Sequence, residues 1–242
     1  MTAGFEPVPD DWRQFDELVL SPILAGAVDA FHERGYHGTS VRDIARRVGV
    51  TVPALYYHYK NKEAMLVALL TGSMADVLAR CRAAVEQAGD RPERQFAHLV
   101  ECIVLWMVHR RQFAMLDSEI RALSPENRRH YAAMRKELEN LLLRIVEDGI
   151  ESGGFAVTFP ADTTRALLGM LQAIATWYNP EGPLTPEQLA RRYVDIALRT
   201  VGAYPSTIDV QPEAERSKRS TSSKKKGGAR TGTTSRRPAP VR

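Results

Sequence analysis

Residues 21–70, SPILAGAVDAFHERGYHGTSVRDIARRVGVTVPALYYHYKNKEAMLVALL, decide how this chain folds. Within them, Ser40-Val-Arg-Asp43 has the pattern of a capping box, which predicts the start of a short helix. Gly49 permits a tight turn, and Thr51 then caps a second short helix, with Pro53 in its tolerant first turn. Two short helices joined by a glycine turn form a helix-turn-helix, whose second helix fits the major groove of DNA.

The second of these helices carries polar and aromatic residues where a buried helix would carry aliphatic ones. Leu55 is its clearest core residue, whereas Thr51 and the run Tyr56-Tyr57-His58 have little reason to be hidden together. Lys60-Asn61-Lys62 follows at the start of the next helix, where backbone amides and ammonium groups can both meet phosphate. The pattern predicts a surface that binds DNA.

Helical signals also dominate the rest of the chain. A hydroxyl residue followed by a proline, which suits the cap and first position of a helix, opens three segments: Ser21-Pro22, Ser124-Pro125 and Thr185-Pro186. Apolar residues recur at helical spacing after each of them, and in further runs at roughly 62–87, 93–110 and 161–178. The one strand-like piece, residues 155–159, is too short and isolated to form a sheet. The sequence therefore predicts an all-α fold.

Composition excludes several classes of protein. The chain has 242 residues and is 44% hydrophobic, which is enough to bury a core. Its two cysteines, Cys81 and Cys102, are too few for a disulfide framework or a cysteine-based zinc site. The N-terminus lacks the pattern of a signal peptide, and no uninterrupted apolar run has the length of a membrane span. We expect a cytoplasmic protein without a membrane partner.

The net charge of +4 is unevenly distributed along the chain. Residues 213–242 contain ten Lys or Arg and two Glu, a charge of +8, so the preceding residues carry −4. DNA binding must therefore depend on a local motif. We expect residues 1–20 to form a flexible arm and residues 204–242 a disordered basic tail, because both segments lack apolar periodicity.

The run of residues 25–70 resembles the DNA-binding domain of the tetracycline-repressor (TetR) family. The shared features are AxxxFxxxGYxxTS, IAxxxGV, LYYHY in place of LYxHF, and KNKEAML before a long helix. The resemblance implies an all-α fold of about nine helices. A three-helix helix-turn-helix domain would occupy residues 21–68, and a helical domain for effector binding and dimerisation would occupy residues 69–203.

The resemblance also implies DNA contacts at particular positions. Arg42 matches a base-reading position, where an arginine can bind guanine N7 and O6 together. The remaining contacts, to phosphate or to bases, are implied for Thr39, Ser40, Thr51, Val52, Pro53, Ala54, Tyr56, Tyr57, His58 and Lys62. Ser40 equally suits a cap alone, and Tyr56 a position at the edge of the core. His58 has no partner at metal-ligand spacing, so we expect no metal site.

The second half of the chain has no catalytic motif and no cofactor motif, so we expect no enzyme activity and no cofactor. Aromatic and methionine residues with polar tips suit an adjustable apolar pocket, and they equally suit an ordinary core. The candidate effector-binding residues are Trp106, His109, Phe113, Tyr131, Met134, Met170, Trp177 and Tyr178. Arg110, Arg111 and Arg121 suit either the phosphates of coenzyme A or a solvated basic face.

The resemblance implies that the chain is a transcriptional regulator, most simply a repressor that leaves its operator when a small hydrophobic effector binds. The segment from Trp177 to Val201 resembles relatives that control fatty-acid and steroid degradation, so an acyl-CoA or a lipid or steroid catabolite is the expected effector. The helices at about 161–178 and 186–202 match the family's dimer interface, which implies a homodimer on a pseudo-palindromic double-stranded operator. The alternative is an effector-independent DNA-organising protein that uses its basic tail.

Overall fold

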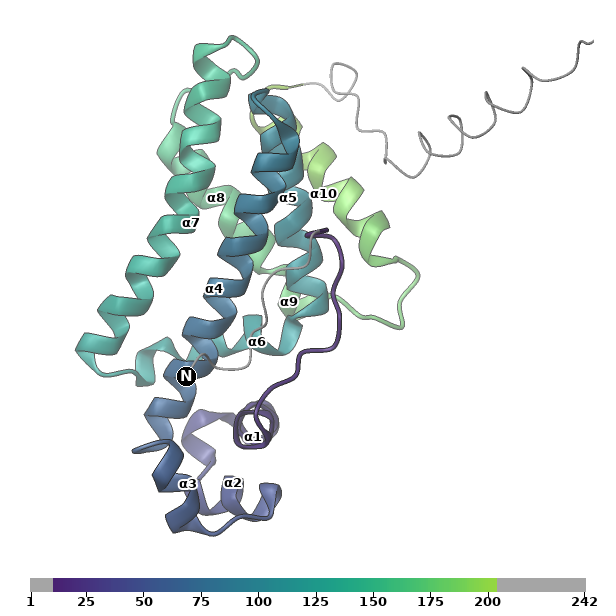
Figure 1. The fold of residues 1–242 in the computed structure, drawn as a ribbon. Helices are drawn as coiled ribbons and strands as arrows, with labels where there is room; N and C mark the ends of the chain where they lie inside the picture. The colour runs from purple at the N-terminus through teal and green to yellow at the C-terminus, as the bar shows by residue number, and fades with distance from the viewer. Residues whose placement is uncertain (1–10, 204–242) are drawn as a thin grey trace, which may run out of the picture. The chain divides into compact units, whose positions relative to one another are not determined.

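The computed structural model describes residues 11–203, and within this range the chain is helical and contains no strand. The predicted basic tail, residues 204–242, lies outside the described residues. The elements, drawn in Figure 1, are α1 (Pro22–Gly38), α2 (Val41–Val48), α3 (Val52–His58), α4 (Lys62–Ala88), α5 (Pro92–His109), α6 (Arg111–Met115), a 3-10 helix η1 (Leu116–Ala122), α7 (Pro125–Glu151), α8 (Pro160–Gln172), α9 (Ile174–Trp177) and α10 (Pro186–Thr200). The all-α prediction is confirmed.

The helix-turn-helix forms where its local signals place it. The Ser40 hydroxyl accepts a hydrogen bond from the Asp43 amide, and the Asp43 carboxylate accepts one from the Ser40 amide. Gly49 ends α2 with φ 76°, a left-handed conformation that glycine adopts without steric cost. Thr51 caps α3 by accepting from the Ala54 amide. These caps fix both helices, and Leu55 anchors α3 in the core.

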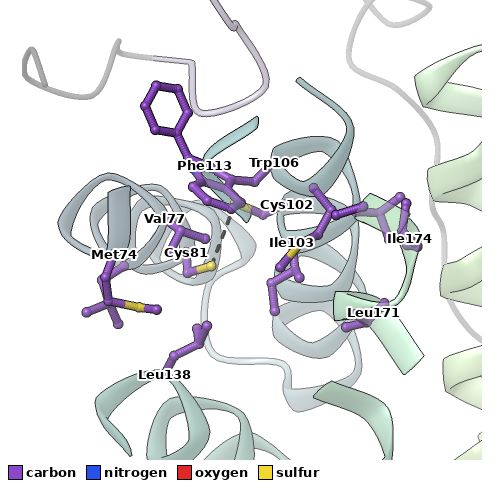
Figure 2. Packing of buried hydrophobic residues seen from close by; sticks show 14 of the residues in the cluster. Met74, Val77, Cys81, Cys102, Ile103, Trp106, Phe113, Leu138, Leu171 and Ile174 are labelled. Carbon is purple, nitrogen blue, oxygen red and sulfur yellow. Dashed lines mark hydrogen bonds between the residues drawn. The ribbon is translucent and has the colours of Figure 1, made fainter. Parts of the chain in front are cut away.

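The second domain is organised around α4 and α5, which pack against each other, with α7 and α8 on one side and α10 against α5. Figure 2 shows where α4 and α5 meet, with Cys81 facing Cys102 at an Sγ–Sγ distance of 3.8 Å. Both cysteines are free thiols within the core. Helix α4 has the length and hydropathy of a membrane span, but 61% of its most apolar window is buried inside the protein. It is therefore the central core helix.

The apolar run expected as one helix at 161–178 is divided into α8 and α9. Around Ala173 the backbone tightens to a three-residue spacing, because the Ala173 carbonyl accepts from both the amide (3.0 Å) and the hydroxyl (2.7 Å) of Thr176. A threonine hydroxyl bonded to the backbone in this way commonly bends a helix. The helix axis therefore changes direction between α8 and α9, before Tyr178.

The expectation of a flexible arm at residues 1–20 is corrected for residues 11–20. Trp12 is only 1% exposed, and Arg13 forms an ion pair with Glu101 at 2.8 Å. Phe15 is stacked on His109 with ring centroids 4.6 Å apart. The segment lacks periodicity because it is an extended chain, and its aromatic rings find their partners on α4 and α5.

Candidate DNA-binding surface and effector cavity

Most of the predicted DNA-contacting residues lie on the exposed surface of α2 and α3. Arg42, Thr51, Pro53, Ala54 and His58 are exposed, and Val52 is half-buried. The Tyr57 side chain is 88% exposed and Tyr56 is 49% exposed, which places two large aromatic groups in solvent on one short helix. The cost of exposing such rings is explained if a partner covers them.

Ser40 is exposed at the start of the same surface, where its hydroxyl caps α2. The Ser40 hydrogen bonds, followed by the Arg46 and Arg34 guanidinium groups, hold the pKa of Asp43 below its usual range. The carboxylate therefore remains charged and keeps the cap formed. The Ser40 amide and hydroxyl both donate to the Asp43 carboxylate, so a phosphate contact at Ser40 would have to replace one of these hydrogen bonds.

Thr39 and Lys62 face the protein interior. The buried Thr39 hydroxyl donates at 2.9 Å to the carbonyls of Ala30 and Gly35. The Lys62 ammonium donates to the Tyr36 carbonyl (2.6 Å) and the Thr39 carbonyl (2.7 Å), and burial lowers the pKa of Lys62. Both side chains thus hold the end of α1, where Gly35 leaves helical geometry at φ 72°. The geometry gives them this structural role, and the phosphate contacts implied for them stay predictions.

A cavity of about 480 Å³ lies in the second domain, between α4, α5, α6, η1, α7, α8 and α9. Three of the eight candidate effector-binding residues line it: Trp106, Phe113 and Tyr131. Methionines supply much of the remaining apolar wall, namely Met74, Met107 and Met115. Their flexible side chains suit ligands of differing shape.

The other five candidates do not line this cavity. His109 is stacked on Phe15, and Met134 and Met170 are partly buried against the core. Trp177 is 49% exposed and stacked on Tyr193, with centroids 6.3 Å apart. The buried Tyr178 donates its hydroxyl to the Leu184 carbonyl at 3.0 Å, which closes the loop before α10. Aromatic content alone did not separate cavity residues from packing residues.

A polar cluster on the cavity wall had no counterpart among the sequence motifs. The Tyr131 hydroxyl donates to Asp117 at 2.6 Å, and Asp117 forms an ion pair with Arg135 at 3.4 Å. Arg135 in turn donates to the Gln172 side chain at 3.5 Å. Burial first, and then the Asp117 carboxylate, raise the pKa of Tyr131 well above its ordinary value, so the phenol remains a donor.

A second cavity of about 400 Å³ adjoins the first and shares five lining residues with it: Met74, Arg135, Leu138, Gly169 and Gln172. Its rim adds Lys136 and Arg165, both of which pair with Glu139, at 2.9 and 3.3 Å. The combined site therefore passes from an apolar interior to a rim with three cationic groups.

Two arginines considered for coenzyme A phosphates are used within the fold. Arg110 is buried and donates to the Asp16 carbonyl at 2.7 Å, and Arg111 donates to the Ala175 carbonyl at 2.7 Å. Neither of them lies on a solvated basic face. Arg121 is exposed on η1.

Two carboxylates connect the effector half to the DNA-binding half. Glu119, on the same 3-10 helix as Asp117, accepts a hydrogen bond from the Tyr36 amide in α1 at 3.3 Å. Glu63, at the start of α4, accepts from the Ser124 amide and from the Asn127 side chain, both at 2.7 Å. A shift of η1 relative to the cavity would therefore displace or break the hydrogen bond between Glu119 and the end of α1.

Comparison with known proteins agrees with this two-part architecture. Residues 23–69 match the family model described as bacterial regulatory proteins, tetR family, and residues 89–201 match a tetracyclin repressor-like C-terminal domain. The chain belongs to the TetR family of transcriptional regulators. It is a DNA-binding regulator and not an enzyme.

Several named relatives align with most of this TetR-family chain. The HTH-type transcriptional repressor KstR2 of Mycobacterium tuberculosis is 30% identical over 178 residues, covering 73% of this chain and 89% of that protein. The structure of PfmR from Thermus thermophilus has a TM-score of 0.68 and 33% identity, covering 74% and 98%. AibR, solved with isovaleryl coenzyme A and operator DNA, has a TM-score of 0.64 and 28% identity, covering 72% and 95%.

Proposed function

We propose that this regulator is a repressor that leaves its operator when a coenzyme A thioester with a compact apolar acyl group binds. The observation that carries the proposal is the pair of adjoining cavities, one apolar and one with a cationic rim. A volume of about 480 Å³ is within the range of small-molecule sites. The binding of isovaleryl coenzyme A by the structural relative AibR supports this class of effector.

Each part of such a thioester has a matching part of the site. The acyl group would lie against Trp106, Phe113 and the methionines of the inner cavity. The anionic phosphates would lie toward Arg135, Lys136 and Arg165, which pair with the carboxylates of Asp117, Glu139 and Asp162. A phosphate would bind at this rim by competing with these carboxylates for the guanidinium and ammonium groups.

The DNA-binding end of the proposal uses the exposed residues of α2 and α3. Arg42 would read a guanine, and Val52 and Ala54 would offer methyl surface to thymine. Ser40, Thr51, Pro53, Tyr56, Tyr57 and His58 complete the proposed contact surface. Thr39 and Lys62 are left out, because their side chains hold α1.

We include a homodimer built through α8 and α10 in the proposal, placing two recognition helices on a pseudo-palindrome. Apolar side chains that suit this face are Ile196, which is 44% exposed, and the partly buried Leu168, Met170 and Tyr193. Several apolar residues of these helices, Leu167, Leu171, Leu189 and Val201 among them, are buried within the protomer. The proposed interface therefore uses only some of the apolar residues of these two helices.

Release would begin at Arg135. A phosphate that binds this guanidinium competes with Asp117, which would leave Asp117 on the 3-10 helix η1 held by the Tyr131 hydroxyl and weaken the attachment of η1 to α7. Because Glu119 of η1 holds the Tyr36 amide, the end of α1 would move with it. The effector shifts the equilibrium only if it binds more tightly to the conformation with low affinity for DNA.

Isothermal titration calorimetry with isovaleryl coenzyme A, and separately with coenzyme A alone, tests the proposed effector class. We expect the wild-type protein to bind the thioester more tightly than the free cofactor. Arg135→Gln should weaken thioester binding at least tenfold, about 1.4 kcal/mol. The matched control Arg191→Gln, which changes an exposed arginine on α10, should leave it unchanged. Absence of binding to the wild-type protein would contradict the proposed class.

A further inference from the structure

Residues 11–20, which we call the N-terminal strap, run along the effector domain and lead directly into the first helix of the DNA-binding domain. Figure 1 shows the strap in dark purple as it descends to α1. At its far end Ser21 caps α1, and Leu18 and Leu20 pack against the core. The strap is continuous with α1 and docks on the effector domain through non-covalent contacts, so it links the two domains in addition to α4.

Aromatic and charged contacts fix the start of the strap on α4 and α5. The Trp12 indole is 1% exposed, and its Nε1 donates to Gln87 Oε1 at 2.7 Å. Arg13 makes two parallel hydrogen bonds with Glu101, at 2.8 and 2.9 Å. A bidentate pair of this kind specifies position as well as adding stability.

Alternate carbonyl groups of the strap accept hydrogen bonds from two buried arginines. Arg80, which is 3% exposed, donates to the carbonyls of Trp12 (3.0 Å) and Gln14 (2.6 Å). Arg110 donates to the carbonyl of Asp16. Because a buried guanidinium without acceptors is costly, the strap contributes to the stability of the effector domain.

The Phe15 ring contacts the guanidinium groups of both Arg80 and Arg110. Its ring is 4.2 Å from Arg80 Cζ and 5.4 Å from Arg110 Cζ, and it is stacked on His109. Cation–π contacts strengthen when the cation is removed from water, as it is for these two arginines. A displacement of either guanidinium would therefore change its contact with the Phe15 ring.

A direct chain of hydrogen bonds joins this docking site to the effector cavity. Asp76 accepts from Arg80 Nε at 3.0 Å through one oxygen and from Trp106 Nε1 at 2.8 Å through the other. The Trp106 ring is part of the cavity wall. A ligand that moves this indole must move or break its bond to Asp76, the carboxylate that also holds Arg80.

We propose that the N-terminal strap transmits cavity occupancy to α1 through Trp106, Asp76 and Arg80. The identity of the effector rests on the proposed function, but the coupling does not. Thermodynamic linkage is reciprocal, so if cavity occupancy changes operator binding, operator binding must also change the environment of Trp106. The strap can therefore be tested from the DNA side without any effector.

Fluorine NMR of protein labelled with 5-fluorotryptophan measures this coupling. The chain has three tryptophans, so single Trp→Phe variants assign every resonance. The probe is a duplex selected from random DNA by the protein itself. We expect this duplex to shift the Trp106 resonance of the wild-type protein, and the shift to fall at least twofold in Arg13→Ala/Phe15→Ala. The matched control Val19→Ala, on a strap residue that is 68% exposed, should retain the full shift.

Two outcomes overturn the strap proposal: an unshifted Trp106 resonance in the wild-type protein, or an equal shift in the double variant and in the Val19 control. Deletion of residues 1–16 provides a second variant, used once its spectrum shows that it is folded. It should abolish the shift, and retention of the shift would count against the strap. The double variant keeps the carbonyls that satisfy Arg80, so it remains informative if the deletion does not fold.

The same variants separate this proposal from the proposed function. The measured quantity is the operator Kd with and without saturating isovaleryl coenzyme A. The ratio of the operator Kd with the thioester to the Kd without it reports the coupling. We expect this ratio to be at least fivefold closer to one in the double variant than in the wild-type protein, and to be unchanged in the Val19→Ala control. A Kd ratio of one in the wild-type protein would contradict the proposed effector class. The operator-induced shift of the Trp106 resonance would still test the strap proposal.

Discussion

At the scale of single residues, Lys62 shows how one side chain can hold a domain together. Its ammonium donates to two carbonyls at the end of α1, and it lies 4.1 Å from the centre of the Tyr36 ring. These contacts replace the helical hydrogen bonds that Gly35 interrupts. Lys62 therefore fixes the junction between α1 and α2.

Lys62→Met is expected to lower the free energy of unfolding by about 1–3 kcal/mol, because two carbonyls lose a charged donor. Urea denaturation measures this change, and Lys60→Met, at an exposed neighbouring position, serves as the control. If both variants are equally stable and only Lys62→Met loses affinity for DNA of every sequence, the phosphate contact implied by the family resemblance is correct instead.

Arg42 carries the claim of sequence readout. Its side chain is exposed at the second position of α2, next to the Ser40 cap. Arg42→Ala should cost about 1–3 kcal/mol of operator binding and relax the preference at one base pair. Fluorescence anisotropy with the operator and with random duplex measures both quantities. An equal loss on the two duplexes would make Arg42 a phosphate contact.

His98 makes stability depend on pH. Burial first, and then Arg13, lower the pKa of His98 below its ordinary value of 6.5, and its Nδ1 lies 3.2 Å from the Ala84 carbonyl. The unfolded chain then binds a proton more readily than the folded chain, so stability should fall as the pH drops below about 6.5. Asp43 and Glu63, whose pKa values are lowered, titrate below this window.

Urea denaturation at pH 7.5 and 5.5 measures the effect, and His98→Asn should lose less stability over that interval than the wild-type protein. A residual loss is expected from His109, because burial also lowers its pKa. Equal losses in the variant and in the wild-type protein would show that His98 does not contribute.

At the scale of helices, α1 and α2 cross closely enough that only glycine fits at position 26. A Cβ on Gly26 would overlap the Val48 side chain, whereas a Cβ on Gly169 in α8 would meet no atom within 4 Å. Gly26→Ala should therefore destabilise the protein by about 1–3 kcal/mol, and Gly169→Ala should stabilise it by about 0.5–1 kcal/mol. Thermal unfolding compares the pair, and a stable Gly26→Ala variant would contradict the described packing.

Helix positions were predictable from sequence wherever their signals are local. Ser40, Thr51 and Thr185 cap the helices that follow them, and each accepts from an amide three residues ahead. The strap was not predictable, because Trp12 and Gln87 are 75 residues apart in the chain. Asp117 was missed for a similar reason, since it lies in an irregular 3-10 segment and its partners are on α7.

At the scale of the whole molecule, a signal must travel from the cavity to the surface of α2 and α3. The structure offers polar links at Glu63 and Glu119, the continuous helix α4, and the strap. All of them converge on α1 and the start of α4. The helix-turn-helix is therefore held from two sides, and its position depends on the state of the effector domain.

The central claim is that a thioester in the cavity releases the protein from its operator. The most direct measurement is the Kd of the full chain for a selected operator duplex, by fluorescence anisotropy, with and without saturating isovaleryl coenzyme A. We predict an increase of at least tenfold, about 1.4 kcal/mol of coupling, together with a strong preference for operator over random duplex in the absence of the thioester. An operator Kd that stays constant across coenzyme A thioesters of differing acyl size, or equal affinity for operator and random DNA, would contradict the account.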